Sequence, residues 1–116
     1  SGSGAWRRNP EAKWRLTPDA LAELTATQDE ILDRAAALVR PGGRLVYATC
    51  SILPVEDGDR VSAFLARHPS FRMRDARDVW RGLDLGDPPF DGPAMVLTPA
   101  RHGTDGFFAA VLERVG

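Results

Sequence analysis

The clearest structural signal in this chain is the stretch Gly42-Gly43-Arg44-Leu45-Val46-Tyr47-Ala48-Thr49-Cys50-Ser51. A Pro-Gly-Gly break opens it, and the short run that follows is rich in β-branched and aromatic residues, which predicts a β-strand over residues 44–49. Because nearly every residue of this run is apolar, we expect both of its faces to be buried in a parallel sheet. The strand delivers the only cysteine of the chain, Cys50, to its carboxyl end, where open α/β sheets bind their ligands.

An amphipathic helix is predicted before this strand. Thr17 is a good N-cap residue, and Pro18 follows at the first helical position. Apolar residues then recur at steps of three and four until Val39, just before the Pro-Gly-Gly break. Gln28 is the one polar gap in this apolar stripe, and we interpret it as a residue at the rim of the buried face.

The rest of the chain continues an alternation of helices and strands. A second helix is predicted from about Pro54 to Arg67, with Glu56 and Asp57 near its positive end and His68 as a cation at its other end. The order helix, strand, helix, strand, loop, strand indicates an α/β fold. The later elements expected are a half-buried strand at 71–74, a loop over 75–93, a brief strand at 95–97, a turn-rich connection over 98–106 and a final strand at 107–115.

Size and composition limit the class of protein. A length of 116 residues, with 43% hydrophobic and 27% charged residues, is that of one ordinary globular domain. The net charge of −1 gives no global electrostatic reason to expect nucleic-acid or membrane binding, and no apolar stretch is long enough to span a bilayer. A single cysteine excludes an internal disulfide and indicates a reducing compartment, so we expect a cytoplasmic protein.

Positive charge is concentrated at the N-terminus. Residues 1–16 are interpreted as an extended basic and aromatic arm ahead of a domain over 17–116. Such an arm can neutralise phosphates and stack on unpaired bases. It can equally be a solvated segment whose tryptophans pack on the domain, and the cluster alone favours this second interpretation. The residues concerned are Arg7, Arg8, Lys13 and Arg15, bracketed by Trp6 and Trp14.

Cys50 has two possible roles. A lone cysteine at a strand end is most often a small packed hydrophobe. Here the neighbours Thr49 and Ser51 are polar, and the N-terminus of the following helix could favour the thiolate. Glu56 and Asp57 would oppose that effect if they came close.

Most other cysteine chemistries fit the sequence poorly. A cysteine phosphatase would need arginine where Glu56 stands, and the glycines of a nucleophile elbow are missing. One cysteine and two histidines argue against a zinc site. A thiol hydrolase that uses Cys50, His102 and Asp105 is the third hypothesis, although the residues around His102 have the composition of a turn.

Three blocks of the sequence have a recognisable order. They run from Ser1 to Trp14, from Pro41 to Glu56 through Gly-Gly-Arg-Leu-Val-Tyr-Ala-Thr-Cys-Ser, and from Asp105 to Ala110 through Asp-Gly-Phe-Phe. Together they resemble the C-terminal half of the Sun (Fmu) family of S-adenosylmethionine-dependent RNA cytosine-C5 methyltransferases. The resemblance implies the C-terminal half of a Rossmann-like methyltransferase sheet, with three main strands and two helices in this chain.

The resemblance also implies a chemistry. In the family, the thiolate of the Thr-Cys motif adds to C6 of cytosine, which makes C5 reactive enough to accept a methyl group; this gives Cys50 the role of nucleophile. The substrate is then RNA, ribosomal RNA in particular, and Arg7, Arg8, Lys13 and Arg15 become candidate RNA contacts.

The same resemblance implies that this chain is only part of the catalytic machinery. The family's main S-adenosylmethionine motifs would precede Ser1, so we expect weak cofactor binding and no activity from the chain alone. The 44–49 strand would have an open edge, for which we expect cover by self-association or by the arm. The alternative is a non-enzymatic RNA-binding or protein-interaction module in which Cys50 is simply packed.

Overall fold

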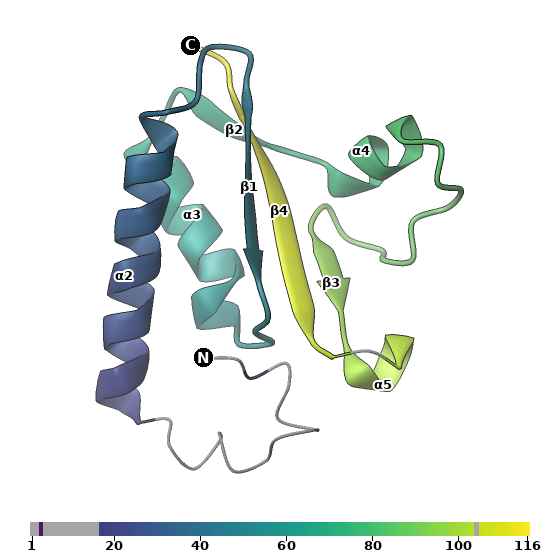
Figure 1. Cartoon of the computed structure of the whole chain (residues 1–116), viewed down its shortest axis with the longest axis horizontal. Coiled ribbons are helices and arrows are strands. Elements are labelled where there is room, and N and C mark those ends of the chain that lie inside the picture. The colour runs from purple at the N-terminus through teal and green to yellow at the C-terminus, as the bar shows by residue number, and fades with distance from the viewer. Residues whose placement is uncertain (1–2, 4–16, 104) are drawn as a thin grey trace.

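The computed structural model describes residue 3, residues 17–103 and residues 105–116; the predictions for the 1–16 arm therefore lie almost wholly outside the described residues. The described part is a mixed α/β fold in which one small antiparallel sheet is flanked by helices (Figure 1). Its elements are α2 (Pro18–Ala36), β1 (Arg44–Thr49), the 3-10 turn η2 (Pro54–Glu56), α3 (Gly58–Arg67), β2 (Phe71–Arg74), α4 (Ala76–Gly82), β3 (Met95–Leu97), α5 (Pro99–His102) and β4 (Phe107–Arg114).

The helix that precedes β1 begins as the sequence predicts, although it ends at Ala36 and not near Val39. The side chain of Thr17 accepts a hydrogen bond from the backbone N–H of Ala20 at 3.1 Å, and Pro18 occupies the first turn. After α2 the chain reverses through Gly42, whose φ of +82° is a left-handed conformation that glycine adopts without strain. The neighbouring Gly43 allows a close approach, since a Cβ there would lie 2.9 Å from the carbonyl oxygen of Arg40. These two glycines are what bring β1 back alongside α2.

The sheet has the order β1-β4-β2, and all of its pairings are antiparallel. The expectation that β1 lies in a parallel sheet was therefore wrong for its direct neighbour. The last strand, β4, runs between β1 and β2, and this places β1 and β2 parallel to one another but apart. β3 pairs with the first half of β4, with Met95 opposite Ala109.

The hydrophobic core lies on one face of the sheet, under α2 and α3 (Figure 1). Leu112 and Ala110 of β4 are both fully buried there. On the other face, residues of α4 line a small pocket together with Ala109 and Val111 of β4. The core residues are Leu32, Ala36, Tyr47, Val61, Phe64, Phe71, Phe108, Ala110 and Leu112.

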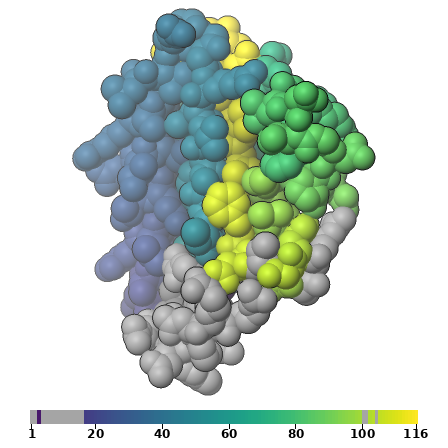
Figure 2. Space-filling view, turned by 45° about the vertical axis from the view of Figure 1, so that its right-hand side comes forward, coloured from purple at the N-terminus to yellow at the C-terminus, as the bar shows by residue number. Residues whose placement is uncertain are grey.

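β1 is therefore buried on one face only, contrary to the prediction. Val46 is 59% exposed, and Ala48 is exposed beside it. Figure 2 shows this face of β1 and β4 reaching the surface between α2 and α4. Within the described residues, this largely apolar strand is therefore covered on one face only.

Two segments that the sequence predicted as loops contain short helices. α4 begins after Asp75, whose carboxylate accepts a hydrogen bond from the backbone N–H of Arg77 at 2.9 Å. Its Trp80 packs edge-to-face on Phe90, which holds the following glycine- and proline-rich segment against the body. α5 is a single turn within the 98–106 connection.

Candidate active site around Cys50

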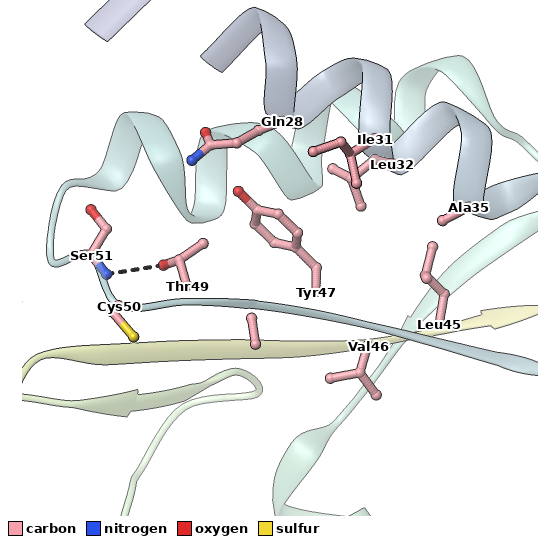
Figure 3. A pocket seen from close by; sticks show the side chains of 11 residues that line it. Gln28, Ile31, Leu32, Ala35, Leu45, Val46, Tyr47, Thr49, Cys50 and Ser51 are labelled. Carbon is pink, nitrogen blue, oxygen red and sulfur yellow. Dashed lines mark hydrogen bonds between the residues drawn. The ribbon is translucent and has the colours of Figure 1, made fainter. Parts of the chain in front are cut away.

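At the carboxyl end of β1, the side chain of Cys50 points to the opposite side from those of Thr49 and Ser51. Side chains alternate across a strand, and Figure 3 shows Tyr47, Thr49 and Ser51 directed toward the helices while Cys50 and Val46 point to the opposite side. Cys50 is a free, exposed thiol. The interpretation of Cys50 as a packed core residue does not agree with this exposure.

Thr49, immediately before the cysteine, is bound to a buried acid. Its hydroxyl donates to Oδ1 of Asp57 at 2.5 Å and accepts from the backbone N–H of Ser51 at 3.2 Å. Asp57 is only 7% exposed. Burial raises the pKa of the Asp57 carboxyl to about 6; the negative charge of Glu56 adds to this effect, and the hydrogen bond from Thr49 opposes it.

Ser51, immediately after the cysteine, is bound to a second buried acid. Its hydroxyl donates to Oε2 of Glu56 at 2.5 Å, and its oxygen accepts from the backbone N–H of Leu53 at 3.0 Å. Glu56 has no exposed surface. The phenol of Tyr47 donates to the carbonyl oxygen of Glu56 at 2.5 Å, and burial raises the pKa of that phenol, so it stays a donor.

The same network reaches α2 and the N-terminal segment. Gln28 Nε2 donates to Oε1 of Glu56 at 3.3 Å, so this half-buried residue, interpreted from the sequence as lying at the rim, also bonds the buried acid. Ser3 is 2% exposed; its Oγ lies 3.0 Å from Oγ of Ser51 and accepts from the backbone N–H of Ile52 at 2.9 Å. We refer to Thr49, Ser51, Glu56 and Asp57 as the flanking cluster.

A pocket of about 430 Å³ follows the free edge of β1 and ends at Cys50 and Ser51 (Figure 3). Aliphatic side chains dominate its walls, among them Ile31 and Leu45, and none of the described residues that line it carries a carboxylate. No described strand pairs with this edge, because β1 is a terminal strand in the sheet order. This agrees with the predicted open edge, whereas its cover by self-association or by the arm stays a prediction.

The structure places His102 in a structural role. Its Nδ1 accepts from the backbone N–H of Thr98 at 3.1 Å, and its Nε2 lies 2.6 Å from the carbonyl oxygen of Pro89. Both ring nitrogens are thus engaged by backbone groups, which argues against a hydrolase in which His102 activates Cys50.

Among the described residues, the remaining histidine and the charged side chains form no second catalytic or metal-binding cluster. His68 stacks on Phe64, and its Nε2 lies 2.7 Å from Asp33, whose pKa is lowered chiefly by that hydrogen bond. Within residues 17–103 and 105–116, no group of His, Cys, Asp and Glu is arranged to hold a metal ion, and no helix there is long and apolar enough to cross a membrane. The candidate RNA contacts Arg7, Arg8, Lys13 and Arg15 lie outside the described residues.

Comparison with known proteins identifies the family. The family model described as 16S rRNA methyltransferase RsmB/F matches residues 1–113. A putative methyltransferase of Mycobacterium tuberculosis is 44% identical over 115 residues, which cover 99% of this chain and 24% of that protein. The ribosomal RNA small subunit methyltransferase B of Shewanella oneidensis is 38% identical over 112 residues, covering 97% of this chain and 24% of the relative.

Solved structures agree with the fold. The crystal structure of PH0851 matches with a TM-score of 0.81 and 42% identity, over 97% of this chain and 24% of that chain. The structure of NSun6 from Pyrococcus horikoshii with SFG matches with a TM-score of 0.69 at 21% identity, over 87% of this chain and 25% of that one, and this match bears on the fold alone. The chain spans about a quarter of the length of the relatives it matches. It belongs to the RsmB/F family of 16S rRNA methyltransferases.

Proposed function

We propose that this chain is the part of an RNA 5-methylcytosine methyltransferase that carries the nucleophile, Cys50, and that its substrate is ribosomal RNA. The observation that carries the proposal is the presentation of Cys50. The thiol lies just past the end of β1, free and exposed, while the residues on both sides of it are bound to buried acids. Membership of a methyltransferase family gives methyl transfer as the reaction class, and the exposed sulfur of Cys50 supplies an atom that can attack the substrate.

The chemistry that this arrangement supports is conjugate addition. The thiolate of Cys50 forms a bond to C6 of the cytosine, and the electrons of the C5–C6 double bond move so that C5 becomes nucleophilic. After C5 is methylated, it loses its proton and the sulfur leaves C6 with its bonding electrons, which restores the ring. The target base must be unstacked to reach the sulfur, and unstacking costs a few kcal/mol. An exposed thiol suits a substrate that approaches from solvent.

A methyltransferase family implies S-adenosylmethionine as the methyl donor, and we infer that the described residues lack a complete site for it. The described walls of the pocket beside Cys50 lack a carboxylate for ribose hydroxyls. Gly42, Gly86 and Gly103, the described glycines with positive φ, show no atom within 4 Å of a Cβ built on them, so none of them forms a close cradle. We infer that the chain alone binds the cofactor weakly and does not turn over. Calorimetry with S-adenosylmethionine tests this inference, and micromolar binding by the isolated chain would refute it.

The basic arm completes the proposal. We infer that Arg7, Arg8, Lys13 and Arg15 contact RNA phosphates, so that replacing any one by glutamine weakens RNA binding and lowers its salt dependence. The alternative is an RNA-binding or interaction module without catalysis, which none of the described contacts around Cys50 favours.

Replacement of Cys50 by serine in the full-length protein separates these possibilities. With tritiated S-adenosylmethionine and small-subunit ribosomal RNA, the wild-type protein should transfer methyl groups and the Cys50→Ser variant should not. Exposed Ser62→Ala, on the surface of α3, is the matched control and should keep wild-type activity. Methyl transfer by Cys50→Ser at the wild-type rate would show that the cysteine is not the nucleophile.

A further inference from the structure

In the flanking cluster, both neighbours of Cys50 make the same kind of hydrogen bond. Thr49 and Ser51 each donate a hydrogen bond of 2.5 Å to a carboxylate, from Asp57 and Glu56 respectively. The two acids are adjacent in sequence, at the junction between η2 and α3. The segment that carries the thiol is thus held on both sides by one rigid dipeptide.

That dipeptide is itself fixed by the core. The phenol of Tyr47 in β1 donates to the backbone carbonyl of Glu56, and Gln28 in α2 donates to its side chain. Strand, helix and turn therefore meet at Glu56, which is fully buried. Hydrogen bonds from β1 and α2 thus fix the acid that accepts from Ser51.

Stability by itself does not explain this cluster, because burying it lowers the free energy of unfolding. Two adjacent buried carboxylates repel each other and lose their hydration, and neutral side chains could bond the same hydroxyls at lower cost. Hydrogen bonds to ionised acceptors are, however, shorter and stronger than neutral ones. Costly groups of this kind tend to be kept where a functional geometry needs them.

We propose that Thr49 and Ser51, held by Asp57 and Glu56, are positioning residues that fix the backbone on both sides of Cys50 and so aim its sulfur at C6 of the target cytosine. This inference rests on the function proposed above. Addition to C6 requires the sulfur to lie within a narrow range of distance and direction, and a misplacement of about 1 Å can cost about 100-fold in rate. None of the four residues needs to touch the RNA for this role.

The test uses the full-length protein and substitutions at Thr49 that differ in one group. Thr49→Val keeps the shape and removes the hydroxyl, so it breaks the bonds to Asp57 and to the Ser51 N–H; Thr49→Ser keeps the hydroxyl. We expect Thr49→Val to lower kcat about 100-fold while the KM for RNA changes less than about 2-fold, and Thr49→Ser to recover most of the loss. Thr27→Val, which removes an exposed hydroxyl on α2, is the matched control.

A second pair of variants guards against a folding defect at Thr49. Asp57→Asn retains an oxygen that can accept from Thr49, and Asp57→Ala does not. We expect kcat to fall from wild type to Asp57→Asn and further to Asp57→Ala, because the neutral amide oxygen accepts a weaker hydrogen bond from Thr49 than the carboxylate does. Melting temperatures are measured for all variants. The rate at which the enzyme forms a covalent adduct with RNA containing 5-fluorocytosine reports on the addition step separately from turnover.

The outcomes distinguish the two proposals. If Cys50→Ser abolishes methylation but Thr49→Val and Asp57→Ala keep the wild-type kcat, the positioning role is overturned and the nucleophile stands. If activity in these variants falls only in proportion to the folded fraction, the cluster is structural and the positioning role is again overturned. If Cys50→Ser remains active, the proposed function itself fails.

Discussion

Replacing Asp57 by asparagine should stabilise the folded chain above neutral pH. The carboxyl of Asp57 is 7% exposed, and its pKa is raised by burial from 3.8 to about 6. A shift of roughly 2 units corresponds to at most about 3 kcal/mol, since one unit is worth about 1.4 kcal/mol. Solvent screening through the exposed part of Asp57 lowers the effect, and we expect about 1–2 kcal/mol at pH 8.

The sign follows from proton binding. Because the pKa is higher in the folded than in the unfolded state, the folded protein holds more protons between pH 4 and 6. The wild-type chain should therefore gain stability from this group as pH falls from about 6 to about 4. The asparagine side chain does not titrate, so the advantage of the variant should shrink over that range and be nearly absent at pH 4.

The measurement is urea unfolding of both proteins at pH 8, 6 and 4. Asp33, Asp75 and Glu113, whose pKa values are lowered, destabilise the fold as the pH falls, but their contribution cancels in the difference between wild type and variant. Asp59→Asn, an exposed change two residues away, is the control and should give no pH-dependent difference. A constant difference for Asp57→Asn from pH 4 to 8, or destabilisation at pH 8, would refute the account of a strained buried carboxylate.

Three further predictions concern the fold and its open edge. Leu112→Ala removes a fully buried side chain from the central strand and should lower the free energy of unfolding by about 2–5 kcal/mol in the same urea assay; a loss below about 1 kcal/mol would mean that β4 is not central. Gly43→Ala should lower the free energy of unfolding by about 1 kcal/mol or more, because the new Cβ would lie 2.9 Å from the carbonyl oxygen of Arg40. Gly58→Ala, at the start of α3 with no atom within 4 Å of the new Cβ, should be neutral or slightly stabilising. The reverse order of melting temperatures would contradict the turn geometry. Light scattering after size exclusion should show the isolated chain self-associating unless its own arm covers the edge. Val46→Lys, which places a charge on the open edge strand, should shift any such dimer toward monomer. A wild-type monomer whose arm is also accessible to protease would contradict the expected cover of the edge.

The sequence was a good guide wherever local chemistry decides the structure. Thr17 and Pro18 begin α2 as predicted, and the Pro-Gly-Gly break turns the chain into β1. Cys50 also lies just past the end of β1, as the extent of the apolar run predicts. Each of these features depends on residues within a few positions of one another.

Long-range features were not predictable in the same way. The last strand of the chain is inserted between the first two, which no periodicity of β1 could show. Glu56 and Asp57 have the composition of a solvated first helical turn, yet both are buried because Thr49 and Ser51 reach them from β1. The one available signal was the pair of hydroxyl residues around Cys50, a few positions before acids that could accept from them.

The direct test of the central claim is to identify the atom that attacks the RNA. The full-length protein is incubated with S-adenosylmethionine and substrate RNA in which the target cytosine carries fluorine at C5, because the fluorine cannot leave as a proton does and the covalent adduct accumulates. Digestion and mass spectrometry should then find the nucleotide attached to the peptide that contains Cys50, with no adduct in Cys50→Ser. An adduct on another residue, or one that forms equally well without the Cys50 thiol, would contradict the account.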